Sequence, residues 1–189
     1  FDIHRAYEML ESDRESQYLR RCAVRAIFSF VEACIETIKV EVRSDIRVGL
    51  FIPELTDKEK ETLGSLHIVG DRNADKQLPL DANIKRTFRL AAKIWGLDSY
   101  RLTTGGEDFA DFRHAKNARN RLTHPKSYYD IQVVDEDMHC HTIAYQWFLG
   151  EFSRLFRARV EDIARSLPPD DGKRLLQGTG VGDLENGAQ

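Results

Sequence analysis

Arg119 and His124 are the pair of residues whose types and spacing best suit chemistry in this chain. A permanently charged guanidinium stands five residues before an imidazole that can exchange a proton near neutral pH. Both lie in residues 113–126, which hold five Lys or Arg, two His and no carboxylate. The whole chain carries a formal charge of −3, so this positive surplus is local. Such a combination is suited to holding or cleaving a phosphodiester.

The element that must position this pair is a helix predicted over residues 109–122. Apolar residues recur there at spacings of three and four, and Arg119 falls inside the apolar stripe that they form. Pro125 disfavours helical backbone angles at His124, so we expect the helix to end just before it. On a continuous helix the two side chains would point about 140° apart. Leaving the helix at His124 could turn the imidazole back toward the guanidinium.

An inward-facing Arg119 has three possible surroundings. It can pair with a carboxylate inside the fold, extend to the edge of the bundle, or face a polar cleft between helices or subunits. His124 also has a simpler interpretation, as a histidine that caps the end of the helix and interacts with its dipole.

The remaining pattern predicts an all-α fold, an up-and-down bundle of four or five helices with an irregular insertion at about 44–82. Residues 16–43 read as a central helix, because apolar side chains cover more than half of its circumference. A last long helix is predicted from about residue 135 to the Pro168-Pro169 pair. We expect one domain over residues 1–167 and a disordered tail over 168–189, which is rich in Gly, Asp and Asn.

Composition narrows the class of protein. The chain has 189 residues, of which 41% are hydrophobic and 31% charged, as in an ordinary globular domain. No apolar run is long enough to span a bilayer, so no membrane partner is expected. The three cysteines are far apart, which fits a reducing, cytoplasmic location. The negative net charge argues against a general nucleic-acid coat protein.

The motif resembles that of a known family. Arg119, the Asn120 that follows it and His124 match the Arg-x4-6-His signature of the HEPN superfamily (higher eukaryotes and prokaryotes nucleotide-binding), in which Asn often follows the Arg. The all-helical layout, the long early helix and the place of the motif before the last long helix are also similar. The resemblance covers roughly residues 1–167 in architecture, and only the six-residue motif is diagnostic.

The resemblance implies a metal-independent endoribonuclease of toxin or antiviral-defence type, which acts as a homodimer with two copies of the motif in one cleft. Arg119 would hold the scissile phosphate, His124 would act as general base or acid, and Asn120 would support the site. The RNA substrate would be left with a 2′,3′-cyclic phosphate. No metal and no other cofactor is implied.

Local charge adds four candidate contacts to the RNA backbone, which are Arg113, Lys116, Arg121 and Lys126. An antitoxin or regulatory protein is a possible further partner. Lys126 occupies the position where HEPN toxins that pair with a nucleotidyltransferase antitoxin usually carry a Tyr, so that particular partner is not expected.

Two other functions stay open. The chain can be a catalytically inactive HEPN-like module that dimerises or binds a ligand or protein, in which case Arg119 is paired internally and His124 is remote from any cleft. A metal-binding helical enzyme that uses His139, Cys140 and His141 is the weaker alternative, because neighbouring side chains on a helix diverge by 100° or more.

Overall fold

The computed structural model describes residues 2–49, 54–64 and 78–179, and within these ranges all regular secondary structure is helical. Its elements are α1 (Asp2–Ser12), α2 (Gln17–Arg47), α3 (Asp57–Leu63), α4 (Leu80–Ile94), α5 (Glu107–Thr123), the 3-10 helix η1 (Tyr128–Ile131), α6 (Asp135–Ser166) and α7 (Pro169–Gly178). The predicted all-α class is confirmed. Among the described residues, no helix has both the length and the apolar character that crossing a bilayer requires.

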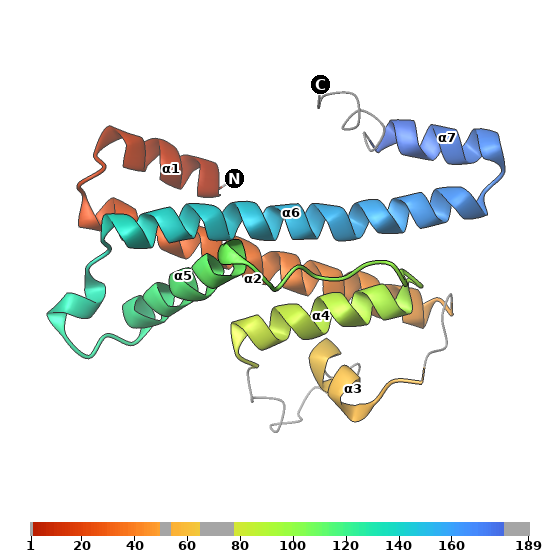
Figure 1. The fold of residues 1–189 in the computed structure, drawn as a ribbon, viewed down its shortest axis with the longest axis horizontal. Helices are drawn as coiled ribbons and strands as arrows, with labels where there is room; N and C mark the ends of the chain where they lie inside the picture. The colour runs from red at the N-terminus through yellow and green to blue at the C-terminus, as the bar shows by residue number, and fades with distance from the viewer. Residues whose placement is uncertain (1, 50–53, 65–77, 180–189) are drawn as a thin grey trace.

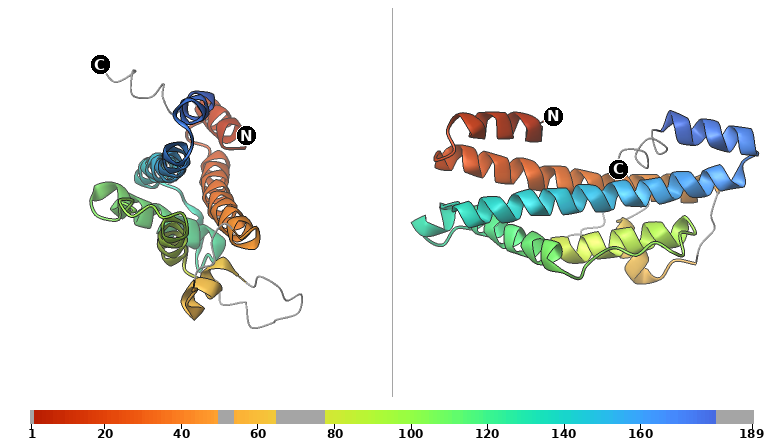
Figure 2. Two further views of the ribbon diagram at one scale, coloured as in Figure 1. Left: turned by 90° about the vertical axis from the view of Figure 1, so that its right-hand side faces the viewer. Right: turned by 45° about the horizontal axis from the view of Figure 1, so that its top comes forward.

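The two longest helices, α2 and α6, run side by side in the same direction along the molecule (Figure 1). Helices α4 and α5 cover one side of this pair, and α1 and α7 lie on the opposite side (Figure 2). Helix α5 runs antiparallel to α4 and α6, whereas α2 and α4 run the same way. The bundle around the core therefore consists of four helices, α2, α4, α5 and α6.

Each of these four helices buries one phenylalanine in the core, and the four rings contact one another in two pairs. Phe28 of α2, Phe88 of α4, Phe112 of α5 and Phe148 of α6 are each at most 2% exposed. The ring centroids of Phe28 and Phe112 are 6.2 Å apart, and those of Phe88 and Phe148 are 6.0 Å apart. Burying each ring stabilises the fold by roughly 1.5–3 kcal/mol, so these two ring contacts help to join α2 to α5 and α4 to α6.

Helix α2 extends past its predicted end at residue 43 and reaches Arg47. The added turn carries the buried Asp45, whose carboxylate accepts hydrogen bonds from Trp95 Nε1 at 2.8 Å and Arg159 Nη2 at 2.7 Å. These partners come from the end of α4 and from α6. These tertiary contacts stabilise the last turn of α2, and the local sequence pattern does not predict them.

The predicted insertion at 44–82 is shorter than expected, since α2 takes its first residues and α4 begins at Leu80. Residues 50–53 and 65–77 of this stretch lie outside the described ranges. A brief helix within this stretch, α3, has Thr56 as its N-cap. The Glu59 backbone N–H donates to Thr56 Oγ1 at 3.3 Å and the Thr56 N–H donates to Glu59 Oε2 at 2.8 Å, which completes the capping box.

The tail is the clearest correction to the sequence-based expectation. Residues 168–189 were expected to be disordered, but α7 occupies Pro169–Gly178. Proline at the first helical position suits a helix start, and two aspartates follow it in the first turn. The last part of the tail, 180–189, lies outside the described residues.

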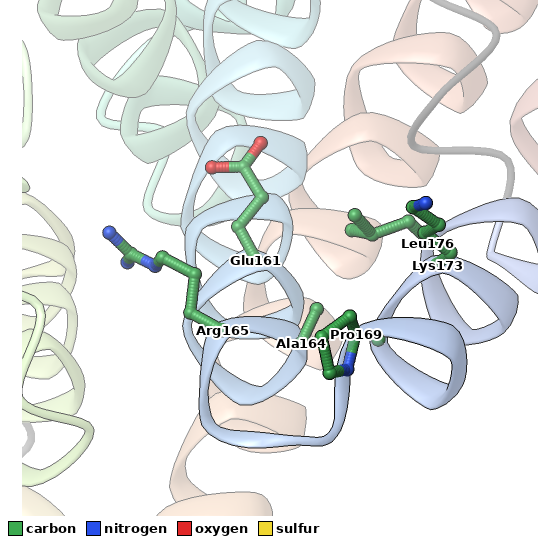
Figure 3. A pocket seen from close by; sticks show the side chains of 7 residues that line it. Glu161, Ala164, Arg165, Pro169, Lys173 and Leu176 are labelled. Carbon is green, nitrogen blue, oxygen red and sulfur yellow. The ribbon is translucent and has the colours of Figure 1, made fainter.

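Close packing against α6 explains why α7 forms despite its weak helical pattern. Gly172 approaches α6 so closely that a Cβ atom there would lie 2.5 Å from the Ala164 carbonyl oxygen. Figure 3 shows Pro169 beside Ala164 and Leu176 directed toward α6, around a hollow of about 370 Å³. The glycine that lowers helix propensity is thus what permits docking.

Candidate functional site

Helix α5 carries the motif and ends where the sequence predicts. Its buried face consists of Phe109, Phe112, Ala115, Ala118 and Leu122. The helix stops at Thr123, and His124 has φ −131° and ψ 62°, outside the helical region. The His124 backbone N–H still donates to the Asn120 carbonyl at 3.0 Å. The restriction that Pro125 places on the preceding residue accounts for this ending.

Arg119 lies at the open edge of the contact between α5 and α2. Its Nη2 donates to Glu32 Oε1 of α2 at 2.6 Å, and its Nη1 donates to Asn120 Oδ1 at 3.3 Å. The side chains of Arg119 and Glu32 are 32% and 48% exposed. The guanidinium therefore extends to the solvent-exposed edge of the bundle, one of the three expected surroundings, and its carboxylate partner also lies at that edge and not inside the fold.

A groove runs between α2 and α5 around this ion pair. It encloses about 300 Å³ and is lined by Val24, Arg25, Phe28, Ser29, Glu32, Arg119, Leu122 and Thr123. We call it the α2–α5 groove. Its floor is apolar, since Phe28 and Val24 are buried, and its walls carry two guanidinium groups, a carboxylate and two hydroxyl groups. An anion entering the groove would therefore meet donors on both helices.

His124 does not line this groove. Its side chain is exposed and makes no hydrogen bond within the described parts of the chain, although Thr123 immediately before it belongs to the lining. Asn120 is also exposed, and its contact with Arg119 holds the guanidinium from the same helix. In one chain, the structure thus brings Arg119 and Asn120 together and leaves His124 beside the end of the groove.

The four candidate RNA-contacting cations divide into two pairs. Lys116 donates to Asp81 Oδ1 of α4 at 3.0 Å, and Arg121 donates to Asp137 Oδ2 of α6 at 2.9 Å. Arg113 and Lys126 are exposed, and their side chains make no ion pair with any described residue. Lys116 and Arg121 therefore join helices, and only the other pair is free to meet a ligand.

Asp81 shows how strongly Lys116 is engaged. Burial alone would raise the pKa of the Asp81 carboxyl, but the hydrogen bond and the charge of Lys116, together with a backbone hydrogen bond and the charge of Lys85, lower that pKa. Asp81 lies in the first turn of α4, which begins at Leu80 with Pro79 at the N-cap position.

A buried polar cluster lies behind the motif, and the sequence pattern did not reveal it. Asp137 is 1% exposed and accepts hydrogen bonds from Arg121, from His114 Nε2 at 3.3 Å and from the Val134 backbone N–H at 3.1 Å. The bond from the Val134 N–H caps the start of α6, because Asp137 stands at the third helical position. The bonds to α5 depend on how α5 and α6 pack, so spacing along the chain carries no signal for them.

The three residues of the metal-binding alternative point apart. His139 is exposed, His141 is fully buried against Phe28, and the Cys140 thiol donates to Asp111 Oδ1 at 3.3 Å. Burial and the neighbouring carboxylates raise the pKa of Cys140 to about 11, which disfavours a thiolate ligand. Within the described ranges, no three His, Cys, Asp or Glu side chains are placed to share a metal ion.

Known proteins offer no direct guide to this site. Neither a protein-family model, nor a curated protein, nor a solved structure matches the chain. Its chemistry must therefore be argued from the groove, the motif and the charges described above.

Proposed function

We propose that this protein is a metal-independent endoribonuclease of toxin or antiviral-defence type, in which Arg119 and His124 act at a cleft formed by two copies of the chain. The observation that carries the proposal is the position of Arg119. It lies on the buried side of α5, yet its guanidinium opens into the α2–α5 groove. A purely structural arginine on that side would be expected in a closed pair.

Arg119 would bind the scissile phosphate. A guanidinium stays charged at every relevant pH and can give two parallel hydrogen bonds to a phosphate. Glu32 now occupies one side of the guanidinium and orients it at 2.6 Å. Because Glu32 is 48% exposed, a phosphate can displace this carboxylate into water without leaving a buried charge behind.

His124 would move the protons. Its imidazole would take the proton of a ribose 2′-hydroxyl while the 2′-oxygen attacks phosphorus and the bond from phosphorus to the 5′-oxygen breaks. The imidazolium so formed would then give this proton to the departing 5′-oxygen. The products are a 2′,3′-cyclic phosphate and a 5′-hydroxyl. Arg119 would stabilise the charge that develops on the phosphoryl oxygens, and Asn120 would support Arg119 through the contact between them.

Two copies are part of the proposal because His124 does not line the groove of its own chain. A partner whose α5 end lies against this groove would supply the missing imidazole. Mixing Arg119→Ala protein with His124→Ala protein should then restore cleavage, since one of the two sites in each mixed dimer holds both intact residues. If light scattering shows a monomer at concentrations that cleave RNA, this arrangement is wrong.

The direct test is cleavage of end-labelled RNA by purified protein in EDTA. His124→Ala should lower the rate about 10²–10⁴-fold, as for loss of a general acid or base. Arg119→Ala should lower it about 10²–10³-fold. His139→Ala is the matched control, because His139 is an exposed histidine elsewhere and its loss should leave the rate unchanged.

Two outcomes would overturn the assignment of roles. One is full cleavage by His124→Ala protein. The other is cleavage of an RNA whose 2′-hydroxyl at the cut site is replaced by hydrogen, because the reaction needs that group as its nucleophile. A ribonuclease that endangers its own cell also needs restraint, so an antitoxin or regulatory protein belongs to the proposal, and co-purification from the native host would test for it.

The second candidate is a catalytically inactive HEPN-like module that dimerises or binds a ligand or protein. One observation favours it, namely that Arg119 already has an anionic partner in Glu32. This reading predicts that Glu32→Gln and Arg119→Ala both leave RNA intact and change only stability or self-association. The cleavage assay with EDTA separates the two candidates directly.

A further inference from the structure

A second basic hollow lies away from the motif, between α4 and the segment that follows it. Residues 97–104 run back alongside α4 toward the start of α5 (Figure 1). The two enclose about 510 Å³, which we call the α4 pocket. It shares no lining residue with the α2–α5 groove. Its volume falls within the range that holds small organic ligands, roughly 300–1,000 Å³.

The α4 pocket is lined by four exposed cations and one acid. Lys85, Arg89 and Lys93 follow one another at four-residue spacing on the same face of α4, and Arg101 faces them from the segment, with Asp98 as the acid. In a chain of net charge −3 this is a marked local excess of positive charge. Like charges at this spacing destabilise an isolated helix, and within the described residues only the charge of Lys93 is offset by an ion pair, with Glu59.

Two of these cations have no carboxylate partner within the described residues. Arg89 makes no side-chain hydrogen bond or ion pair there, and the Lys85 ammonium lies 4.7 Å from the centre of the Phe109 ring. Lys93 is paired with Glu59 at 2.8 Å, and Arg101 donates to backbone carbonyls. Lys85 and Arg89 are therefore the groups available to a ligand.

The wall opposite α4 is held in place by α6. The Tyr100 hydroxyl donates to Glu151 Oε2 at 3.2 Å, Trp147 Nε1 donates to the Thr103 carbonyl at 3.0 Å, and Arg154 Nη2 contacts the Arg101 carbonyl. The floor is apolar and contains the buried Ala92, Leu97 and Tyr100. The pocket thus combines a preformed apolar floor with a cationic rim, which lowers the cost of ordering a bound anion.

We infer that the α4 pocket binds a phosphorylated ligand with two or more negative charges. The phosphoryl groups would lie between Lys85 and Arg89, and the body of the ligand would rest on the apolar floor. The same chemistry has two sources, a free nucleoside polyphosphate or the phosphate backbone of an RNA chain. The inference does not rest on the proposed nuclease function, because neither Arg119 nor His124 takes part.

Titration calorimetry with sodium tripolyphosphate and with ATP tests the pocket in the full-length protein. We expect saturable binding of one ligand per chain that weakens as salt increases. Arg89→Gln and Lys85→Gln should each weaken it about tenfold, the usual effect of losing a charge-assisted hydrogen bond. Arg47→Gln and Lys173→Gln remove exposed cations that line neither the α4 pocket nor the α2–α5 groove, and they should leave it unchanged.

Three further results separate the possibilities. Unchanged tripolyphosphate binding in Arg119→Ala protein would show that the α4 pocket, and not the α2–α5 groove, is the site. RNA would be identified as the ligand if tripolyphosphate competes with a labelled single-stranded RNA and Arg89→Gln weakens RNA binding. A free nucleotide would be identified as the ligand if RNA binding is unaffected. Absence of saturable binding, or equal weakening by the control substitutions, would overturn the inference.

Discussion

Two arginines of the motif stand two positions apart and should respond in opposite ways to replacement by alanine. Arg119 pairs with Glu32, whose side chain is 48% exposed, whereas Arg121 pairs with Asp137, whose side chain is 2% exposed. Truncating Arg119 leaves a carboxylate that water can solvate. Truncating Arg121 leaves a buried carboxylate without its guanidinium.

The expected magnitudes follow from these exposures. Losing a pair as open as Arg119–Glu32 costs about 0.2–1 kcal/mol of unfolding free energy. Breaking a buried pair costs about 3–5 kcal/mol, but Asp137 keeps the bonds from Val134 and His114, so we expect roughly 2–3 kcal/mol for Arg121→Ala. For a chain of this size, that corresponds to a fall in Tm of about 4–12 °C.

Urea unfolding followed by circular dichroism measures the stability of both variants, and the RNA cleavage assay measures their activity. Arg119→Ala should be nearly as stable as the parent protein and inactive. Arg121→Ala should be destabilised, and at a temperature where it remains folded it should keep most of its activity. The reverse pattern, with a destabilised Arg119→Ala and a stable but inactive Arg121→Ala, would refute the division into one functional and one structural arginine.

Three further predictions concern other parts of the fold. Burial lowers the pKa of His141, so below about pH 6.5 the unfolded chain binds a proton that the folded chain does not. The free energy of unfolding therefore falls as the pH decreases, by at most about 1.4 kcal/mol per pH unit. His141→Phe should reduce this slope in urea titrations, and an unchanged slope would contradict the prediction. Gly172→Ala places a Cβ against the Ala164 carbonyl and should undock α7, which faster trypsin cleavage within α7 would show while the global midpoint stays nearly constant. Glu151→Ala removes the acceptor of the buried Tyr100 hydroxyl and should cost about 1.5–3 kcal/mol of unfolding free energy. Faster hydrogen exchange over residues 97–104 is the readout, and unchanged exchange would contradict the view that Glu151 holds this segment.

Local pattern was enough to predict most of the helices. The spacing of apolar residues located α2, α5 and α6, and the residues that end helices marked their limits. Gly96 follows α4 with a φ of +67°, a conformation that glycine adopts without strain. Pro125 marked the end of α5. These signals work because periodicity and backbone restriction act within a few residues.

The sequence pattern did not predict the elements that depend on docking against other helices. The last turn of α2 is held by partners of Asp45 on other elements, and α7 forms where Gly172 allows its backbone to touch α6. Both would be marginal as isolated segments, since short helices in water owe most of their stability to packing. Local composition therefore argued against them.

For the candidate site too, local sequence predicts one part and packing between helices decides the other. Residue types and their spacing were sufficient to select Arg119, Asn120 and His124, because chemical capacity and resemblance to a motif are properties of the chain. Packing between helices decided which carboxylate each arginine meets. Arg121 meets a buried carboxylate 16 residues away, and Arg119 meets Glu32 of α2, 87 residues away. Such pairings arise from how four helices surround one core, and no short stretch of sequence encodes that arrangement.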